Sequence, residues 1–126
     1  MHARYLEVGS SIVTANTYAT NRNVTEPAGH GERTVEAIHA AVNLAREARD
    51  AHVRTHPSAA CFVAGSLSTH PPALPPGSES SAAARYPEPE VEEANYLEAA
   101  LAIRDAGVDF LMLEMMKVHR THPPII

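Results

Sequence analysis

The stretch that decides the fold of this 126-residue chain is Ala106-Gly107-Val108-Asp109-Phe110-Leu111-Met112-Leu113-Glu114. Gly107 is typical of the end of a helix, and the apolar run after it is typical of a strand buried on both faces of a parallel sheet. Ligands of such sheets bind beyond the carboxyl ends of the strands. Glu114 follows the run directly, so two interpretations are open: a carboxylate that serves a binding site, or one that only caps and solvates a strand end.

Length and composition indicate one modest globular domain. Hydrophobic residues make up 44% of the chain and charged residues 20%, which is ordinary for a soluble protein. The formal net charge of -5, with ten scattered Lys and Arg residues, argues against nucleic-acid binding. No apolar run reaches the ~20 residues of a membrane span, and the first residues lack the core of a signal peptide. Because Cys61 is the single cysteine, no internal disulfide can form, and we expect a cytoplasmic protein.

The first part of the chain predicts a helix end, a strand and a loop. Residues 2–8 read as the last turns of a helix that Gly9 stops. Its apolar face would consist of Tyr5, Leu6 and Val8. Residues 11–18 are β-branched and largely apolar, which predicts a buried strand with polar residues at its carboxyl end. Residues 20–33 show neither helical nor strand periodicity, so we expect a long loop.

The middle of the chain predicts a second helix and a second strand. Residues 34–52 have helical periodicity, and Thr34 is the expected N-cap. The apolar face of this helix would consist of Val35, Ile38, Val42 and Ala45. Residues 60–66 form a short apolar strand. Cys61 lies inside it, so we interpret this thiol as a small core residue rather than a nucleophile.

The last third predicts a proline-rich loop, a helix and a third strand. Residues 67–90 hold six prolines, which favours an extended loop over the carboxyl edge of the sheet. Residues 90–106 are helical, and residues 108–113 form the strand described first. The apolar face of the helix would consist of Val91, Ala94, Leu97, Leu101 and Ile103. Strands that alternate with helices predict an α/β fold with a parallel sheet.

Only three strands are visible, whereas an ordinary barrel of βα units has eight strands and ~250 residues. A three-stranded sheet with open edges is a poor independent domain, so we expect a piece of something larger. The same open edges predict self-association.

Three motifs, in order, resemble the homocysteine S-methyltransferase family. Residues 5–18 resemble its second strand region. Val63-Ala64-Gly65-Ser66-Leu67 and the later Gly77-Ser78-Glu79 resemble its third-strand motif and the loop that follows. Residues 106–114 resemble its fourth strand with the glutamate of that strand. The resemblance implies a partial (β/α)8 TIM barrel, with about three parallel strands and flanking helices.

The resemblance also implies an activity and a site. The family transfers a methyl group to the thiol of homocysteine. Glu114 matches a carboxylate that pairs with the ammonium group of homocysteine, and Asn16 and Thr17 match the polar wall of the pocket. On this basis we expect a partial homocysteine-binding domain over residues 1–117 and a C-terminal tail over 118–126. Homocysteine and a methyl donor are the implied partners, and nothing in the sequence selects the donor.

The chain departs from the family in its metal chemistry. Family members hold zinc on three cysteine thiolates, in regions that have no counterpart here, and Cys61 matches no zinc position. We therefore expect no zinc and no catalytic residue in this chain, which would be a truncated fragment inactive alone. Two histidine pairs, His52 with His56 and His119 with His122, have metal-ligand spacing, but prolines follow both pairs and we interpret them as surface residues.

Two other functions stay open. The chain could be a non-catalytic scaffold, or half-barrel, that pairs with another chain. It could also be a small flavodoxin-like domain that binds an anion, although it lacks a glycine-rich phosphate loop.

Overall fold

A computed structural model of the protein describes residues 1–69 and 87–116, so the predicted tail and most of the predicted proline-rich loop lie outside the described residues. Helices and strands alternate, with two short helices after the first strand. Their order is α1 (His2–Glu7), β1 (Ile12–Ala15), α2 (Arg22–Thr25), the 3-10 helix η1 (Gly31–Arg33), α3 (Thr34–Thr55), β2 (Phe62–Ser68), α4 (Pro89–Asp105) and β3 (Phe110–Glu114). None of the described helices is long and apolar enough to cross a membrane.

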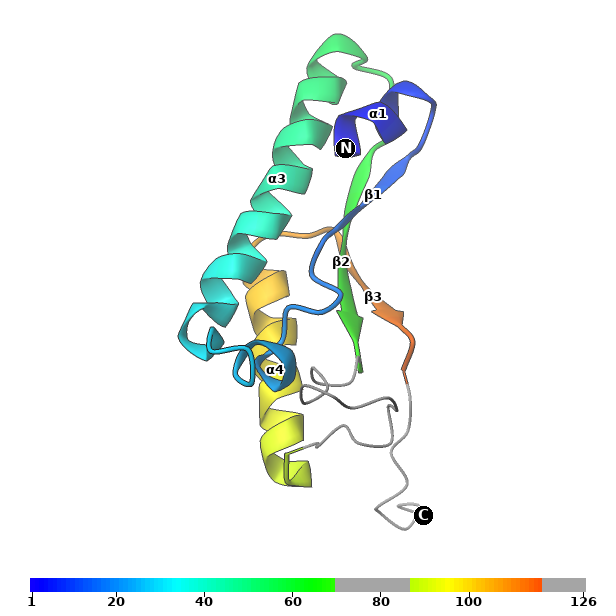
Figure 1. The fold of residues 1–126 in the computed structure, drawn as a ribbon. Coiled ribbons are helices and arrows are strands. Elements are labelled where there is room, and N and C mark those ends of the chain that lie inside the picture. Colours follow the sequence, from blue (N-terminus) through cyan, green and yellow to red (C-terminus); the bar gives the residue numbers. More distant parts are fainter. Residues whose placement is uncertain (70–86, 117–126) are drawn as a thin grey trace, which may run out of the picture.

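The three strands form one parallel sheet in the order β1-β2-β3. Their carboxyl ends therefore meet at the same edge, which is the lower edge of the sheet in Figure 1. Ala15 pairs with Gly65 across β1 and β2, and Ser68 pairs with Glu114 across β2 and β3. The predicted α/β fold with about three parallel strands is confirmed.

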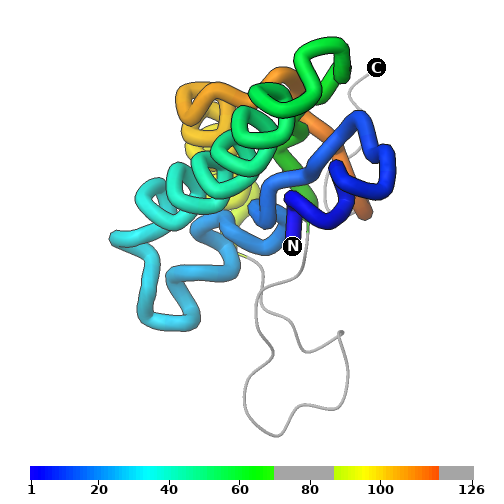
Figure 2. Tube along the Cα trace, turned by 90° about the horizontal axis from the view of Figure 1, so that it is seen from above, coloured from blue at the N-terminus to red at the C-terminus, as the bar shows by residue number. Residues whose placement is uncertain are grey.

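Helices α3 and α4 pack side by side on one face of the sheet, as Figure 2 shows from above. Apolar side chains of α3, α4 and that face of the strands form the core. One part of the core comprises Leu6, Val13, Ala15, Val42, Ala45, Val63 and Ala106. The other part comprises Ile38, Leu67, Ala99, Ala102 and Ile103. Cys61 lies directly before β2 and packs, half-buried, against the first part.

The contact between α4 and β2 is close because Gly65 has no side chain. A Cβ atom at Gly65 would lie 2.0 Å from Cγ2 of Ile103 and 3.2 Å from Cγ1 of Val108. Gly65 therefore faces the helices. Since successive residues of a strand point to opposite faces, Ser66 and Ser68 face the other side of the sheet.

The predicted apolar face of α4 was wrong in most of its residues. Val91, Leu97 and Leu101 are exposed, whereas the buried residues are Ala99, Ala102 and Ile103. The reason is the close approach to Gly65, because only small side chains beside Ile103 let the helix come this near the sheet. Periodicity alone favoured the larger apolar residues, which lie on the solvent side.

The predictions for α1 and the first loop also need correction. Leu6 is buried, but Tyr5 is exposed and Val8 is 83% exposed, so α1 buries a single residue rather than an apolar face. The first strand is shorter than predicted and ends at Ala15. The predicted loop over 20–33 contains the short helices α2 and η1, because short polar segments can form single helical turns that carry no apolar period.

The start of α3 differs from prediction as well. Thr34 is the first residue of α3 rather than its N-cap, and its hydroxyl donates to the carbonyl oxygen of Gly31 at 2.7 Å. Ile38, Val42 and Ala45 are buried as predicted, whereas Val35 is exposed. The helix continues to Thr55, three residues beyond the predicted end.

Strand β3 is not buried on both faces within the described part of the chain. Phe110 and Leu111 are both exposed, and Leu113 is 61% exposed. The cause is that the described helices α3 and α4 cover one face of the sheet, and that β3 lies at its edge with β2 as its single described neighbour. The prediction assumed that both faces of the strand are covered.

Candidate functional site

The carboxyl edge of the sheet holds the candidate site. Glu114 is the last residue of β3 and pairs in register with Ser68, so its side chain shares the face that carries Ser66 and Ser68. This face is opposite to α3 and α4. A cavity of about 920 Å³ extends from this face past β1 to α1 and α3, and its lining at the strand ends includes Asn16, Tyr18, Ser66 and Glu114.

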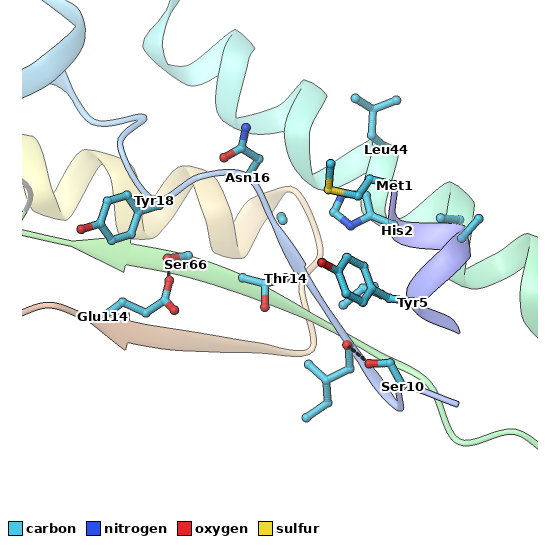
Figure 3. A pocket seen from close by; sticks show the side chains of 15 residues that line it. Met1, His2, Tyr5, Ser10, Thr14, Asn16, Tyr18, Leu44, Ser66 and Glu114 are labelled. Carbon is cyan, nitrogen blue, oxygen red and sulfur yellow. Dashed lines mark hydrogen bonds between the residues drawn. The ribbon is translucent and has the colours of Figure 1, made fainter. Parts of the chain in front are cut away.

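Glu114 is half-buried and accepts a hydrogen bond through Oε2 from the hydroxyl group of Ser66. Figure 3 shows the two side chains facing each other across β2 and β3. Within residues 1–69 and 87–116, no Lys, Arg or His lies within ion-pair distance of Glu114. Among the described residues, the carboxylate is therefore bonded to a neutral donor.

Three hydroxyl groups tie the segments after the strands together. Thr17 donates to the carbonyl oxygen of Ser66 at 2.7 Å, and Ser68 donates to that of Tyr18 at 2.6 Å. Thr69 donates to the carbonyl oxygen of Met115 at 3.0 Å. These bonds join β1 to β2 and β2 to β3 at the edge where regular strand pairing ends. They fix the backbone on which Tyr18, Ser66 and Glu114 are mounted.

The residue after Glu114 has an unusual backbone conformation. Met115 has φ 49°, in the left-handed region that costs a residue other than glycine about 1–2 kcal/mol. Such strain is concentrated at functional sites. The chain therefore turns sharply away as soon as Glu114 is in place.

The predicted site residues Glu114, Asn16 and Thr17 have different environments. Asn16 is exposed and lines the same cavity as Glu114, but its amide points away from the carboxylate (Figure 3). Thr17 is 2% exposed and uses its hydroxyl group on Ser66, and it does not belong to the lining of the cavity. Asn16 and Glu114 thus line the same cavity, whereas Thr17 lies outside the lining and holds the backbone of Ser66.

Ser66 was not singled out as a site residue from the sequence, although it belongs to a motif noted there. Its bond to Glu114 joins residues 48 positions apart, so no local pattern could reveal it. A usable signal is the alternation along β2, since Ser66 and Ser68 are two polar residues on one face of an otherwise apolar strand. Tyr18 lines the cavity beside them.

The other end of the cavity lies along α1 and α3 and is mostly apolar. His2, Tyr5 and Leu44 line it together with Ile12 at the start of β1. Burial, and then the positive N-terminus, lower the pKa of His2 below its ordinary value of 6.5. His2 is therefore more readily neutral in the folded protein than in the unfolded chain.

The segment after β1 is anchored on α4. Arg22 donates two hydrogen bonds to the carboxylate of Glu98, at 2.9 and 2.7 Å. Hydrogen bonds to Glu98, and secondly to Glu26, raise the pKa of Arg22. Asn95 of α4 donates to Asn23 at 2.6 Å. These contacts hold the chain that leads away from Asn16 and Tyr18.

The described residues do not form a metal site. No group of three or more His, Cys, Asp or Glu side chains among them is arranged to hold an ion. Cys61 lies directly before β2 and five residues before Ser66, which places it about 16 Å from Ser66 along the strand direction. His52 and His56 stack with ring centroids 4.3 Å apart at the end of α3, and the pair His119 and His122 lies outside the described residues.

Comparisons with known proteins identify one family. The sequence profile of homocysteine S-methyltransferase matches residues 1–120. The structure is similar to that of the homocysteine methyltransferase MmuM from Escherichia coli in its metallated form, with a TM-score of 0.71 and 26% identity, over 91% of this chain and 40% of that chain. The oxidized form of MmuM gives a TM-score of 0.68 at 24% identity, over 87% and 38% of the two chains. No curated protein gives a significant match.

Proposed function

The chain belongs to the homocysteine S-methyltransferase family, and from this premise we propose that it supplies the amino-acid-binding part of a homocysteine site. Glu114 receives the ammonium group of homocysteine in this proposal, and Asn16 contributes to the polar wall beside it. The chain covers 40% of the length of MmuM. We therefore also propose, rather than state, that the complete barrel to which these residues correspond transfers a methyl group to homocysteine.

A single observation carries the proposal. Glu114 lies in a cavity at the carboxyl edge of a parallel sheet, and its described partner is a neutral hydroxyl group. A half-buried carboxylate without a paired cation attracts a cationic ligand, and an ammonium group can form short, charge-assisted hydrogen bonds with it.

The metal that the family resemblance implies does not fit the described residues. Zinc in a site for thiol substrates needs at least three convergent ligands, and the described residues offer no such group. Cys61, the sole cysteine of the chain, lies far from Glu114 along β2. We therefore assign to these residues the recognition of the amino acid and not the activation of its thiol.

Ligand titration of the purified chain tests the proposal. Homocysteine is compared with 4-sulfanylbutanoate, which has the same thiol and carboxylate but no ammonium group. We expect the chain to prefer homocysteine by about tenfold or more, because a hydrogen bond to a charged group contributes about 1.5–3 kcal/mol. Isothermal titration calorimetry measures both dissociation constants. Glu114→Gln should remove the preference, since the amide keeps the shape but not the charge.

Glu93→Gln is the matched control, because it makes the same change at an exposed position of α4 outside the cavity lining. It should leave the preference for homocysteine unchanged. A Glu114→Gln variant that still prefers homocysteine as strongly as the parent chain would disprove the assignment of the ammonium site.

A half-barrel that pairs with another chain is the second candidate function. The exposed apolar residues Phe110, Leu111 and Leu113 of edge strand β3 favour it, because an open edge with apolar side chains invites a further strand. The same titration separates the two functions, since a pure scaffold would bind homocysteine and 4-sulfanylbutanoate equally weakly.

A further inference from the structure

Within the described residues, few contacts restrain Glu114. It ends an edge strand, its neighbours Leu113 and Met115 are exposed, and β2 is the single described strand beside it. A glutamate side chain loses about 1.5–2 kcal/mol of rotamer entropy when it is fixed in one conformation. A binding site that depends on this carboxylate needs a group that fixes it before the ligand arrives.

We propose that Ser66 is the positioning residue of the Glu114 site, an inference that rests on the function proposed above. The hydroxyl group of Ser66 donates to Oε2 of Glu114 and so selects one conformation of its side chain. Oε1 and the remaining lone pair of Oε2 then stay available for the ammonium group of the ligand. Because the donor is neutral, it orients the carboxylate without cancelling its charge.

The neighbouring serine cannot take this role. Ser68 pairs in register with Glu114 and is nearer along the strand, but its hydroxyl group is donated to the carbonyl oxygen of Tyr18 at 2.6 Å. A hydroxyl group has one proton to donate. Ser66, two residues earlier on the same face, is therefore the hydroxyl group of β2 that serves the carboxylate.

Ser66 is itself rigidly held, as a positioning residue must be. It is 1% exposed, and its carbonyl oxygen accepts the 2.7 Å hydrogen bond from Thr17. The preceding Gly65 is packed against Ile103, and this contact sets the distance between β2 and α4. The position of Ser66 is thus restrained by the contact of Gly65 with α4 and by the hydrogen bond from Thr17 in the segment after β1.

Two variants on one strand test the proposal. Ser66→Ala removes the donor to Glu114, and Ser68→Ala removes an equally buried hydroxyl group that bonds to backbone instead. NMR three-bond couplings report the side-chain rotamer of Glu114 without any ligand. We expect one rotamer in the parent chain and in Ser68→Ala, and an average over rotamers in Ser66→Ala. Ser66→Thr, which keeps the hydroxyl group, should restore the single rotamer.

Ligand titration then connects the rotamer to binding. The preference for homocysteine over 4-sulfanylbutanoate should fall about tenfold in Ser66→Ala and stay unchanged in Ser68→Ala. A general loss of folding would lower the affinity for both ligands alike and leave their ratio unchanged. Averaged couplings in Ser66→Ala with a reduced ratio would support the proposal.

An unchanged Glu114 rotamer in Ser66→Ala would overturn the positioning role. So would an equal fall of the ligand ratio in Ser66→Ala and Ser68→Ala. The proposed function fails by a different result, namely a parent chain that shows no preference between the two ligands. The couplings are measured without ligand, so the two failures are distinguishable.

Discussion

Replacing Gly65 by alanine should destabilise the protein through one identifiable clash. The added Cβ would lie 2.0 Å from Cγ2 of Ile103 and 3.2 Å from Cγ1 of Val108, and both distances are shorter than van der Waals contact. Overpacking a closed core costs about 1–3 kcal/mol, and the clash with a stiff β-branched side chain belongs near the upper end. Replacing glycine by alanine returns about 0.5–1 kcal/mol through the unfolded chain. The expected net loss is about 2 kcal/mol.

Urea unfolding followed by far-ultraviolet circular dichroism measures this loss. A companion substitution, Ile103→Leu, moves the branch of the side chain from Cβ to Cγ and so removes the clashing methyl group with little change of volume. In that background Gly65→Ala should cost less than about 1 kcal/mol, and the difference is the coupling energy of the two sites. Gly31→Ala is the control. Its Cβ would meet the exposed carboxylate of Glu26 at 2.7 Å, which can swing away, and the Cβ of Glu26 at 3.2 Å, which is a milder contact than that with Ile103, so the change should cost less than about 1 kcal/mol.

An equal cost of Gly65→Ala with isoleucine and with leucine at position 103 would contradict the predicted clash. That result would place the cause in the strand backbone and not in the contact with α4. A Gly65→Ala variant as stable as the parent would show that α4 does not approach β2 closely.

Two further predictions concern the apolar end of the cavity and the segment after β1. The lowered pKa of His2 means that the unfolded chain binds its proton more readily, so this group's contribution to stability is present above about pH 6.5 and is lost as the pH falls below it. Between pH 8 and pH 5, the melting temperature of the parent chain should therefore fall more than that of His2→Asn. Melting curves of the two proteins that fall in parallel with pH would contradict this prediction. The ion pair between Arg22 and Glu98 is two-thirds buried and bidentate, so the double-mutant cycle of Arg22→Gln and Glu98→Gln should give a coupling of about 1 kcal/mol. A coupling below about 0.2 kcal/mol would mean that the pair does not anchor the segment after β1.

The order of elements could be predicted from the sequence because it depends on neighbours along the chain. Gly9 and Gly107 mark the ends of α1 and α4, and both have the positive φ values, 97° and 86°, that favour glycine. The buried set Ile38, Val42 and Ala45 follows directly from helical spacing. The position of Glu114 at the carboxyl edge follows from the apolar run before it.

Two of the errors involve contacts between residues that are distant in the sequence, and the one at Thr34 involves a local turn. The buried face of α4 depends on the missing side chain of Gly65, and the exposure of β3 depends on its edge position and on which face of the sheet the described helices cover. Thr34 was predicted as the N-cap because a threonine hydroxyl can accept a hydrogen bond from the first turn of a helix. In the structure this hydroxyl instead donates to the carbonyl oxygen of Gly31 in η1.

The sequence by itself determined the alternation of helices and strands, the parallel sheet and the place of Glu114, because short-range spacing and turn residues dictate each of them. The tertiary structure alone decided the partners of Glu114. Ser66 is 48 residues away and Thr17 is 49 residues from Ser66, and only the register of three strands brings them together. Register depends on the packing of Gly65 against Ile103 and on hydroxyl groups that bond to backbone carbonyls, and the partners in these contacts lie too far apart in the sequence for local spacing to pair them.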